Sequence, residues 1–263
     1  MTISMDSVRT VDVTVVLPVH NNAATLVPLC EQLKAVLKRM GLGFELLFVN
    51  DASTDASPET MQGLARQHRE VTLLKLSRNV GQHIAVLHGL SKASGEVCIV
   101  MDADMQDPPS SLPSLWAARS DGVAAVFGGR RGRYESLARH FTSRLYKRVQ
   151  HIITGLPLDA GMFVLIERPL VQALLEFPTR RPVLPAMIGC LAVPTISIPV
   201  ERQVRIRGRS SYKGLARLRL GIKGIACVLE YRFWSASAPY LQQDACGVVT
   251  EFTRAQVRQD ARR

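Results

Sequence analysis

Two aspartates one residue apart, Asp102 and Asp104, follow a run of apolar residues at 97–101. Such a run predicts a buried strand, and carboxylates on the turn behind a strand can face one crevice. Oxygen ligands of this kind hold Mg²⁺ or Mn²⁺, ions that neutralise the phosphates of a nucleotide. Gln106 adds a neutral oxygen nearby, and a loop-forming Asp-Pro-Pro follows it. We therefore predict a metal site at Asp102, Asp104 and Gln106.

Composition limits the classes of protein to which the chain can belong. With 263 residues and 47% hydrophobic content, it is long enough for one large α/β domain with a sizeable core. Its five cysteines are odd in number and lack Cys-x-x-Cys spacing, which favours a reducing cytoplasm over a disulfide framework or a zinc site. We find no signal-peptide pattern and no run of eighteen apolar residues, so we expect the polypeptide not to cross a membrane.

The net charge of +11 is concentrated in two basic blocks, which we expect to face anions. One block extends from Arg130 to Arg148, and the other, from Arg202 to Lys223, holds eight basic residues and no acidic one. Nucleic acid ranks last among the anions, because the chain has no zinc-finger spacing and only 6% aromatic residues for base stacking. A phosphorylated small molecule or an anionic membrane surface is favoured.

The apolar pattern predicts an α/β fold in which strands and helices alternate. Buried strands are expected at residues 13–17, 44–49, 71–76, 97–101 and 123–127. Apolar residues recur at helical spacing over 26–37 and 84–90, with Asn79 as the expected cap of the second helix. This alternation implies right-handed crossovers and a mainly parallel, Rossmann-like sheet flanked by helices.

Three polar clusters fall at the carboxyl ends of these strands, where ligands bind in open α/β sheets. The clusters are residues 18–22, 50–55 and 102–107. We expect them to line one crevice.

The second half of the chain predicts two amphipathic helices. Over residues 136–153, Arg139 and Ser143 share a face that could bind a phosphate. Over residues 212–229, a basic side opposes an apolar side, which is typical of helices that lie on a membrane surface. A helix packed on the core with its basic face in solvent fits the same pattern equally well.

Four segments follow from these patterns. They are a flexible N-terminus at 1–11, a main domain at 12–211, a C-terminal amphipathic basic helix at 212–232 and a flexible tail at 233–263.

The segments VVLPVHNN (15–22), FVNDASTD (48–55) and DADMQDPP (102–109) occur in register along the chain. Together they resemble the nucleotide-sugar half of family-2 glycosyltransferases, which have the GT-A fold. SRNVGQH (77–83) and the 102–109 segment are similar to the polyprenyl-phosphate branch, which includes dolichol-phosphate mannose synthase and undecaprenyl-phosphate aminoarabinose transferase. The resemblance, which covers residues 12–230, implies a metal-dependent, inverting sugar transfer from a nucleotide-sugar donor to a polyprenyl phosphate.

The resemblance also implies roles for particular residues. Donor binding is implied for Pro18, Val19, Asn21, Asp51, Asn79, Gln82, Asp102 and Ala103. A divalent metal, Mg²⁺ or Mn²⁺, is implied at Asp102, Asp104 and Gln106. Binding of the acceptor phosphate is implied for Arg130, Arg139, Ser143 and Arg205, and catalysis for Asp104, Arg130 and Arg139. Asn50 stands where many relatives carry another Asp, and either a contact with the base or a turn suits it.

Two departures from the family pattern lie on the acceptor side. Ser211 occupies a lysine position in the segment 205–212, and Val164 and Leu165 follow the segment 159–163 where the family has an arginine. The C-terminal membrane helices frequent in the family are not found. The resemblance therefore implies peripheral contact with the inner, cytoplasmic face of the membrane or contact through a membrane-protein partner.

The proposed reaction needs no general base, because a polyprenyl phosphate, with a second pKa near 6, is already largely an anion at neutral pH. His83 and His88 are accordingly expected to pack within a helix. Two other functions stay open. One is a soluble family-2 enzyme with a non-lipid acceptor, and the other is a non-catalytic nucleotide-binding subunit of a membrane complex. The resemblance favours a UDP-sugar donor over GDP-mannose.

Overall fold

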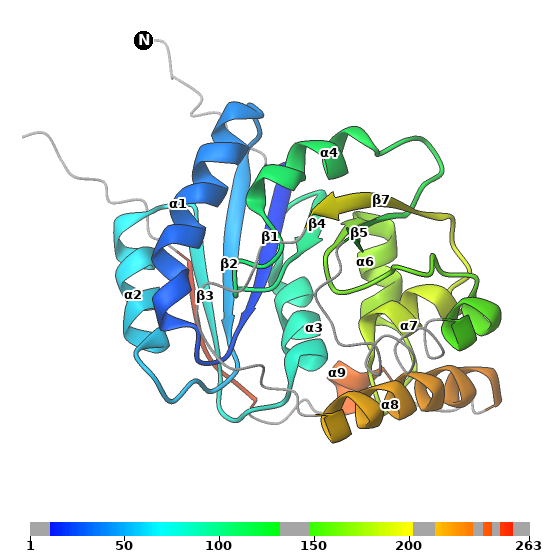
Figure 1. The fold of residues 1–263 in the computed structure, drawn as a ribbon. Coiled ribbons are helices and arrows are strands. Elements are labelled where there is room, and N and C mark those ends of the chain that lie inside the picture. The colour runs from blue at the N-terminus through cyan, green and yellow to red at the C-terminus, as the bar shows by residue number, and fades with distance from the viewer. Residues whose placement is uncertain (1–10, 132–147, 202–213, 234–238, 244–247, 255–263) are drawn as a thin grey trace, which may run out of the picture.

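The computed structural model describes residues 11–131, 148–201, 214–233, 239–243 and 248–254. Within them, helices cover both faces of one eight-stranded sheet with the order β7-β5-β6-β4-β1-β2-β3-β8 (Figure 1). The strands are β1 Val13–Val19, β2 Phe44–Asn50, β3 Val71–Leu76, β4 Val97–Val100, β5 Ala125–Arg131, β6 Val164–Glu167, β7 Thr195–Glu201 and β8 Val249–Arg254. The helices are α1 Ala23–Arg39, α2 Ser57–Gln67, α3 Gln82–Lys92, the 3₁₀ turn Pro109–Ser111, α4 Leu112–Ala117, α6 Arg168–Leu175, α7 Leu184–Cys190, α8 Gly214–Phe233 and α9 Tyr240–Gln243.

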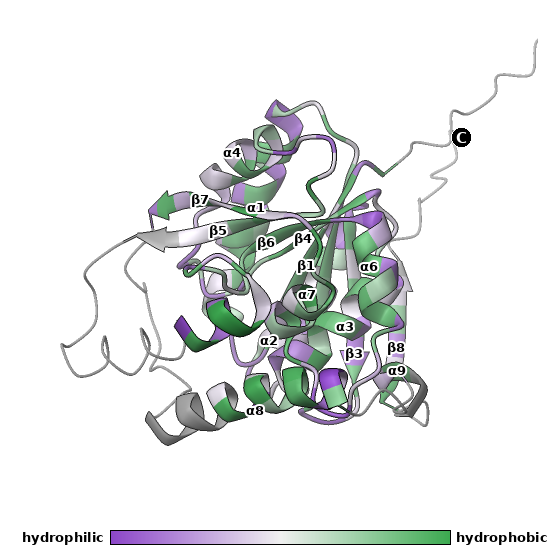
Figure 2. Ribbon diagram, turned by 90° about the vertical axis from the view of Figure 1, so that its right-hand side faces the viewer, coloured by the Kyte–Doolittle hydropathy of each residue, from purple (hydrophilic) through white to green (hydrophobic). Residues whose placement is uncertain are grey.

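The five strands predicted from apolar runs are confirmed, because helices bury each run on both sides. Every residue of β1 and β2 is buried. Val15 and Leu17 belong to the core shared with α1, α2 and α4, whereas Val16 belongs to the core shared with α3, α6 and α7. Figure 2 shows the resulting apolar interior. At about 1.5–3 kcal/mol for each buried aliphatic side chain, these two cores hold the central strands in place.

Strand directions place the carboxyl ends of six strands on one side of the sheet. β1 is parallel to β2 and β4, and β2 is parallel to β3. β6 runs antiparallel to both β4 and β5, so β5 has the same direction as β4. β7 is parallel to β5, so the carboxyl ends of β1 to β5 and of β7 lie along one side, which we call the carboxyl edge. The expected α/β fold with a mainly parallel sheet is confirmed, and β6 and β8 are the described strands that run in the opposite direction.

The start of α3 differs from the expected cap. Its N-cap is Gly81, whose φ of +90° is a conformation that glycine adopts easily. Asn79 lies outside the helix, where its Nδ2 is 3.1 Å from the His20 ring. The prediction of Asn79 as the cap was therefore wrong, because the cap is Gly81, two positions further along the chain.

Two described elements lie within residues 233–263, the segment predicted as a flexible tail. Tyr240–Gln243 form α9, and Val249–Arg254 form β8, which pairs with β3. The side chains described in β8 are exposed, so no apolar alternation marks this strand in the sequence. Backbone pairing with β3 determines its place. The expected basic helix is present as α8, and residues 148–154 form the described end of the helix expected at 136–153.

Candidate active site

The predicted metal turn begins just beyond β4, at the carboxyl edge. Asp102 and Asp104 are partly buried and flank Ala103, which is only 3% exposed. The Thr25 hydroxyl of α1 donates a hydrogen bond of 2.6 Å to the Ala103 carbonyl oxygen. This bond ties the turn to the neighbouring helix, so the two carboxylates are held by a fixed backbone.

Carboxylate and amide oxygens at this turn suit a hard divalent cation. The Asp104 Oδ1 accepts the backbone N–H of Gln106 at 3.0 Å, which folds the turn back on itself. Gln106 is itself partly buried, and its side chain carries an amide oxygen, a donor of the same kind. The donor types therefore fit Mg²⁺ or Mn²⁺ and would be poor ligands for a soft metal.

Left-handed backbone conformations gather at the same edge. Among the described non-glycine residues, φ is positive at Asn21, Ala52 and Met105, which follow β1, β2 and β4, and at Ala192. Such conformations cost about 1–3 kcal/mol each and persist where the surrounding structure imposes them. Three of the four lie in the loops predicted to bind the donor.

Asp51 fixes the loop that leads from β3 into α3. Its side chain is almost fully buried, at 3% exposure. Oδ1 accepts the backbone N–H of Val80 at 2.7 Å, and Oδ2 accepts that of Gly81 at 2.9 Å. Both oxygens of a carboxylate predicted to bind the donor thus interact with the protein backbone.

Side chains after β1 and β2 join these two loops to each other. The Asn21 Oδ1 accepts the backbone N–H of Thr54 at 2.9 Å and that of Asp55 at 3.3 Å. The Asn50 Oδ1 accepts the backbone N–H of Ser53 at 2.9 Å, so Asn50 is a turn residue. Pro18 and Val19 are buried in β1. The carbonyl of Val19 accepts the N–H of Asp51 at 2.8 Å.

Asp55 supports the start of α1 and is held in its charged form. Its Oδ2 accepts the backbone N–H of Ala23 at 3.2 Å, and its Oδ1 accepts that of Ser57 at 2.9 Å. Burial acts to raise the pKa of the Asp55 carboxyl, but these hydrogen bonds and the Ser57 hydroxyl together hold it below its usual value. The loop after β2 is therefore fixed at neutral pH.

Gln82, the first residue of α3, contacts the metal turn. Its Nε2 donates a hydrogen bond to Oδ1 of Asp102, and both residues are partly buried. The structure thus brings together the sequence-predicted residues Asp51, Gln82, Asp102 and Asp104 at one edge of the sheet.

His83 is a packing residue, as expected from the sequence. Its Nδ1 accepts the backbone N–H of Leu184, at the start of α7, at 3.3 Å. Burial lowers the pKa of His83 to about 4, and the Lys223 ammonium of α8 acts in the same direction. At neutral pH His83 is an uncharged acceptor that joins α3 to α7. His88, on the same helix, is buried at 7% exposure.

Of the residues predicted for the acceptor, the structure describes only the backbone of Arg130. The backbone of Arg130 lies in β5, in register with Val200 of β7. Arg139, Ser143 and Arg205 lie outside the described residues.

One side chain near Arg130 was not assigned a role from the sequence. A Cβ atom added to Gly129 would lie 1.9 Å from Oδ2 of Asp159 and 2.5 Å from Oγ of Ser197. Gly129 therefore allows the Asp159 carboxylate to approach the β5 backbone. The Gly-Gly pair before Arg130 is the signal in the sequence for such a close approach.

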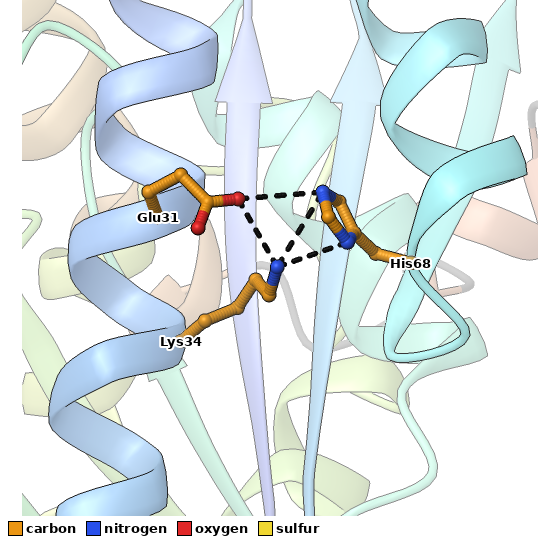
Figure 3. Close-up of polar contacts among 3 residues, drawn as sticks. All are labelled: Glu31, Lys34 and His68. Carbon is orange, nitrogen blue, oxygen red and sulfur yellow. Dashed lines mark hydrogen bonds and ion pairs between the residues drawn. The ribbon is translucent and has the colours of Figure 1, made fainter.

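A second polar cluster lies between α1 and the end of α2. Cys30, Glu31 and His68 are the one group of three His, Cys, Asp or Glu ligands close enough for a metal within the described part of the chain. The Lys34 ammonium lies among them, 3.0 Å from Glu31 Oε1 and 2.9 Å from His68 Nδ1 (Figure 3). Burial raises the pKa of the Cys30 thiol to about 11. Because the Lys34 side chain occupies the space among these groups and the Cys30 thiol is protonated, we interpret the cluster as a contact between α1 and the end of α2 and not as a metal site.

The open groove detected in the described residues lies away from the metal turn. It is lined by Trp116, Arg119 and Glu167 near the amino end of β5, opposite the carboxyl edge. The guanidinium of Arg119 donates two hydrogen bonds to Glu167, of 2.6 and 3.2 Å, and stacks on Trp116 at 4.2 Å. Since these charges pair with each other, the groove offers little to a nucleotide.

A family model described as Glycosyl transferase family 2 matches residues 14–175. The chain belongs to glycosyl transferase family 2. The match covers the loop held by Asp51 and the turn with Asp102 and Asp104, so the residues gathered at the carboxyl edge lie inside the family-2 domain.

Similar proteins include transferases that act on a lipid phosphate. An undecaprenyl-phosphate 4-deoxy-4-formamido-L-arabinose transferase of Pseudomonas paraeruginosa is 33% identical to this family-2 chain over 219 residues. The alignment covers 82% of this chain and 65% of that protein. The chain therefore spans slightly less than two thirds of the relative's length.

Solved structures of two glycosyltransferases resemble this family-2 chain in fold. A mannosyltransferase of Pyrobaculum calidifontis in complex with GDP-Man and Mn²⁺ has a TM-score of 0.60 at 22% identity, covering 89% of this chain and 68% of its own. Glucosyl-3-phosphoglycerate synthase of Mycobacterium tuberculosis, with Mn²⁺, UDP and phosphoglyceric acid, has a TM-score of 0.61 at 17% identity, covering 83% and 78%. These similarities confirm the expected GT-A fold.

Proposed function

We propose that the chain is a metal-dependent, inverting glycosyltransferase that moves a sugar from a nucleotide-sugar donor to a polyprenyl phosphate at the cytoplasmic face of the membrane. The observation that carries this proposal is the turn with Asp102 and Asp104, held at the carboxyl edge beside the loop of Asp51. The undecaprenyl-phosphate transferase of Pseudomonas paraeruginosa, 33% identical to this chain, supports a lipid phosphate as the acceptor.

In this proposal the nucleotide lies against the loops that follow β1 and β2, and its diphosphate lies at the metal turn. The base and ribose lie near Asn21, Asn79 and the hydrogen-bonded backbone of Val19 and Asp51. The diphosphate lies against the backbone at Ala103, which is buried between the two aspartates. A UDP-sugar is favoured over GDP-mannose, and solved structures of similar fold contain either UDP or GDP-Man with Mn²⁺.

The transfer itself requires charge stabilisation and alignment more than proton transfer. A bound Mg²⁺ or Mn²⁺ would offset the charge of the departing nucleoside diphosphate. Asp102, Asp104 and Gln106 would hold that ion, and Arg130 and Arg139 would add positive charge at the two phosphates. An oxygen of the acceptor phosphate forms the new bond to the anomeric carbon, while the old bond's electron pair leaves with the diphosphate on the opposite face.

No side chain has to remove a proton, because the acceptor phosphate is already anionic. The described histidine at the start of α3 agrees with this scheme. His83 accepts a backbone hydrogen bond and has a pKa of about 4, so packing accounts for it.

Exposed apolar side chains on α8 support an acceptor at a membrane surface. Ile222, Leu229 and Phe233 are 58%, 47% and 74% exposed. Leu229 and Phe233 follow Ile222 by 7 and 11 residues, which is close to two and three helical turns, so the three side chains share one face of α8. Ile152, on a separate segment, is 80% exposed. Apolar residues are visible along α8 in Figure 2. We find no helix in the described segments that is long and apolar enough to cross a bilayer.

A soluble phosphorylated acceptor is the second candidate. The solved synthase from Mycobacterium tuberculosis contains phosphoglyceric acid, a water-soluble anion. Ser211, at a position where the family has lysine, also favours a different acceptor site. Both candidates use the same donor site and metal turn.

The two candidates are separated by supplying both acceptors to the same enzyme. The chain is incubated with Mn²⁺ and radiolabelled UDP-sugars or GDP-mannose, either with vesicles containing undecaprenyl phosphate or with 3-phosphoglycerate. We expect label in an acid-labile lipid product. Label only in the soluble product would support the second candidate. Nucleotide binding without turnover in either arm would contradict both and indicate a non-catalytic subunit.

A further inference from the structure

The start of α3 connects the two halves of the proposed donor site. Asp51 holds the backbone N–H groups of Val80 and Gly81 at 2.7 and 2.9 Å. The next residue, Gln82, donates from its side-chain amide to Oδ1 of Asp102. A short segment thus has one end fixed to the loop after β2 and the other end in contact with the loop after β4.

The chemistry of the Gln82 side chain suits the orientation of a metal-binding carboxylate. A neutral amide donor holds one oxygen of Asp102 without neutralising its charge, which a lysine or arginine would do. Side chains that orient metal ligands in this way commonly change metal affinity 10- to 100-fold when they are removed. The amide has restricted freedom, because Gln82 is partly buried and belongs to the first turn of α3.

The backbone behind Gln82 is equally constrained. Gly81 has a φ of +90°, a conformation that L side chains rarely adopt. Asp51, which imposes this path, is 3% exposed and uses both carboxylate oxygens for the backbone. A carboxylate engaged in this way fixes the backbone path that leads to Gln82, in addition to the donor contact predicted from the sequence.

We propose that Gln82 is a positioning residue that orients Asp102 for the divalent metal, and that Asp51 acts on the metal site through the Val80–Gly81 backbone. This inference rests on the proposed metal-dependent function. It assigns to Gln82 and Asp51 an indirect effect on the donor, through the metal.

The test measures metal binding apart from turnover. Mn²⁺ is titrated into the full chain, and free Mn²⁺ is followed by electron paramagnetic resonance. UDP binding is measured separately in the presence of EDTA. The variants are Gln82→Met, which keeps the length of the side chain without a donor, Gln82→Ala, and Gln172→Met as a matched exposed glutamine on α6. Thermal unfolding confirms that each variant is folded.

We expect Gln82→Met and Gln82→Ala to weaken Mn²⁺ binding about 10- to 100-fold, with UDP binding in EDTA changed less than about 2-fold. Asp102→Asn combined with Gln82→Met should bind Mn²⁺ no more weakly than Asp102→Asn alone, because the glutamine acts through that carboxylate. Gln172→Met should match the wild type.

Two outcomes would overturn the inference in different ways. Normal Mn²⁺ binding by folded Gln82→Met, or an equal loss of UDP binding in EDTA, would exclude the positioning role and leave the proposed function intact. Absence of Mn²⁺ binding by the wild-type chain would contradict the metal-dependent function itself, and the positioning role with it.

Discussion

β2 has a buried carboxylate near each end, and the two are satisfied by different kinds of donor. Glu45, near the amino end and 6% exposed, accepts hydrogen bonds from the hydroxyls of Thr14, Thr72 and Ser94 at 2.7–2.8 Å. The backbone N–H of Ser94 adds a fourth bond at 3.1 Å. Within the described part of the chain, the side chain of Asp51, just past the carboxyl end, accepts from the backbone N–H groups of Val80 and Gly81.

The difference shows what each end of the strand does. Hydroxyl donors from β1 and β3 join three neighbouring strands through Glu45, and a hydroxyl can rotate to suit its partner. The donors to Asp51 belong to a loop 29 and 30 residues further along the chain and have fixed directions. The amino end is therefore a closed structural junction, whereas the carboxyl end sets the path of a loop that reaches the metal turn.

The largest expected effect is at the metal turn. Asp104→Ala should lower the turnover number on the order of 100- to 1,000-fold, because a charged ligand of the proposed ion is lost. Unfolding temperature should change little, since Asp104 is partly exposed. Radiolabel transfer at saturating Mn²⁺ measures the first quantity and calorimetry the second. Asp104→Ala with full activity would contradict the metal role.

At the other end of β2, Glu45→Ala should destabilise the fold without affecting the metal. Four donors lose their acceptor in a buried site, which should lower the free energy of unfolding by about 3–5 kcal/mol. Urea unfolding measures this change. Under conditions where the variant is still folded, Mn²⁺ affinity should equal that of the wild type. Weaker Mn²⁺ binding would show that the two ends of β2 are coupled.

His83 extends the comparison, because it too accepts from a backbone N–H near the carboxyl edge. Its pKa in the folded protein is about 4, against an ordinary value of 6.5. Because the folded protein disfavours the protonated imidazole, the contribution of His83 to the free energy of unfolding is complete above pH 6.5. It is lost as the pH falls toward 4, where it has decreased by roughly 3 kcal/mol.

His83→Asn, which keeps an acceptor near the position of Nδ1, should flatten that dependence. The measurement is the free energy of unfolding in urea between pH 7 and 4 for both proteins. A parallel decline in the two would assign the acid sensitivity to other groups.

The smallest expected effects come from a matched pair of amide substitutions. In Glu45→Gln the new NH₂ can face the Thr72 hydroxyl, which rotates to accept, so the loss of stability should stay below about 1.5 kcal/mol. In Asp51→Asn the NH₂ must face the N–H of Val80 or Gly81, and neither can accept. That change should cost about 2 kcal/mol and also weaken Mn²⁺ binding. Equal effects at the two positions would remove the distinction between them.

Much of the fold could be predicted because it depends on local apolar patterns. The runs that became β1, β2, β3 and β4 are buried on both faces and contain few polar residues. β7 and β8 could not be predicted, since β7 is mostly half-exposed and contains Pro199, and β8 is exposed. Their place in the sheet depends on partners distant in the chain.

The candidate site divides in a similar way. The turn with Asp102 and Asp104 could be located from the apolar run before it. The hydrogen bond from Gln82 to Asp102 and the use of both Asp51 oxygens by backbone could not, because they join separate loops. The cap of α3 was misassigned to Asn79 for a related reason, since Asn79 contacts His20, a residue 59 positions earlier.

β8 also affects how the chain folds while it is being synthesised. The Thr250 hydroxyl of β8 contacts the carbonyl of Lys75 in β3 across 175 positions of sequence. At about 5–20 residues per second, a ribosome needs roughly 10–35 s to make that intervening length. During this interval the outer side of β3 is an open template for pairing with other chains. Lys75, the one charged residue of β3, is of the type that discourages such pairing, so it protects the nascent chain until β8 pairs with β3.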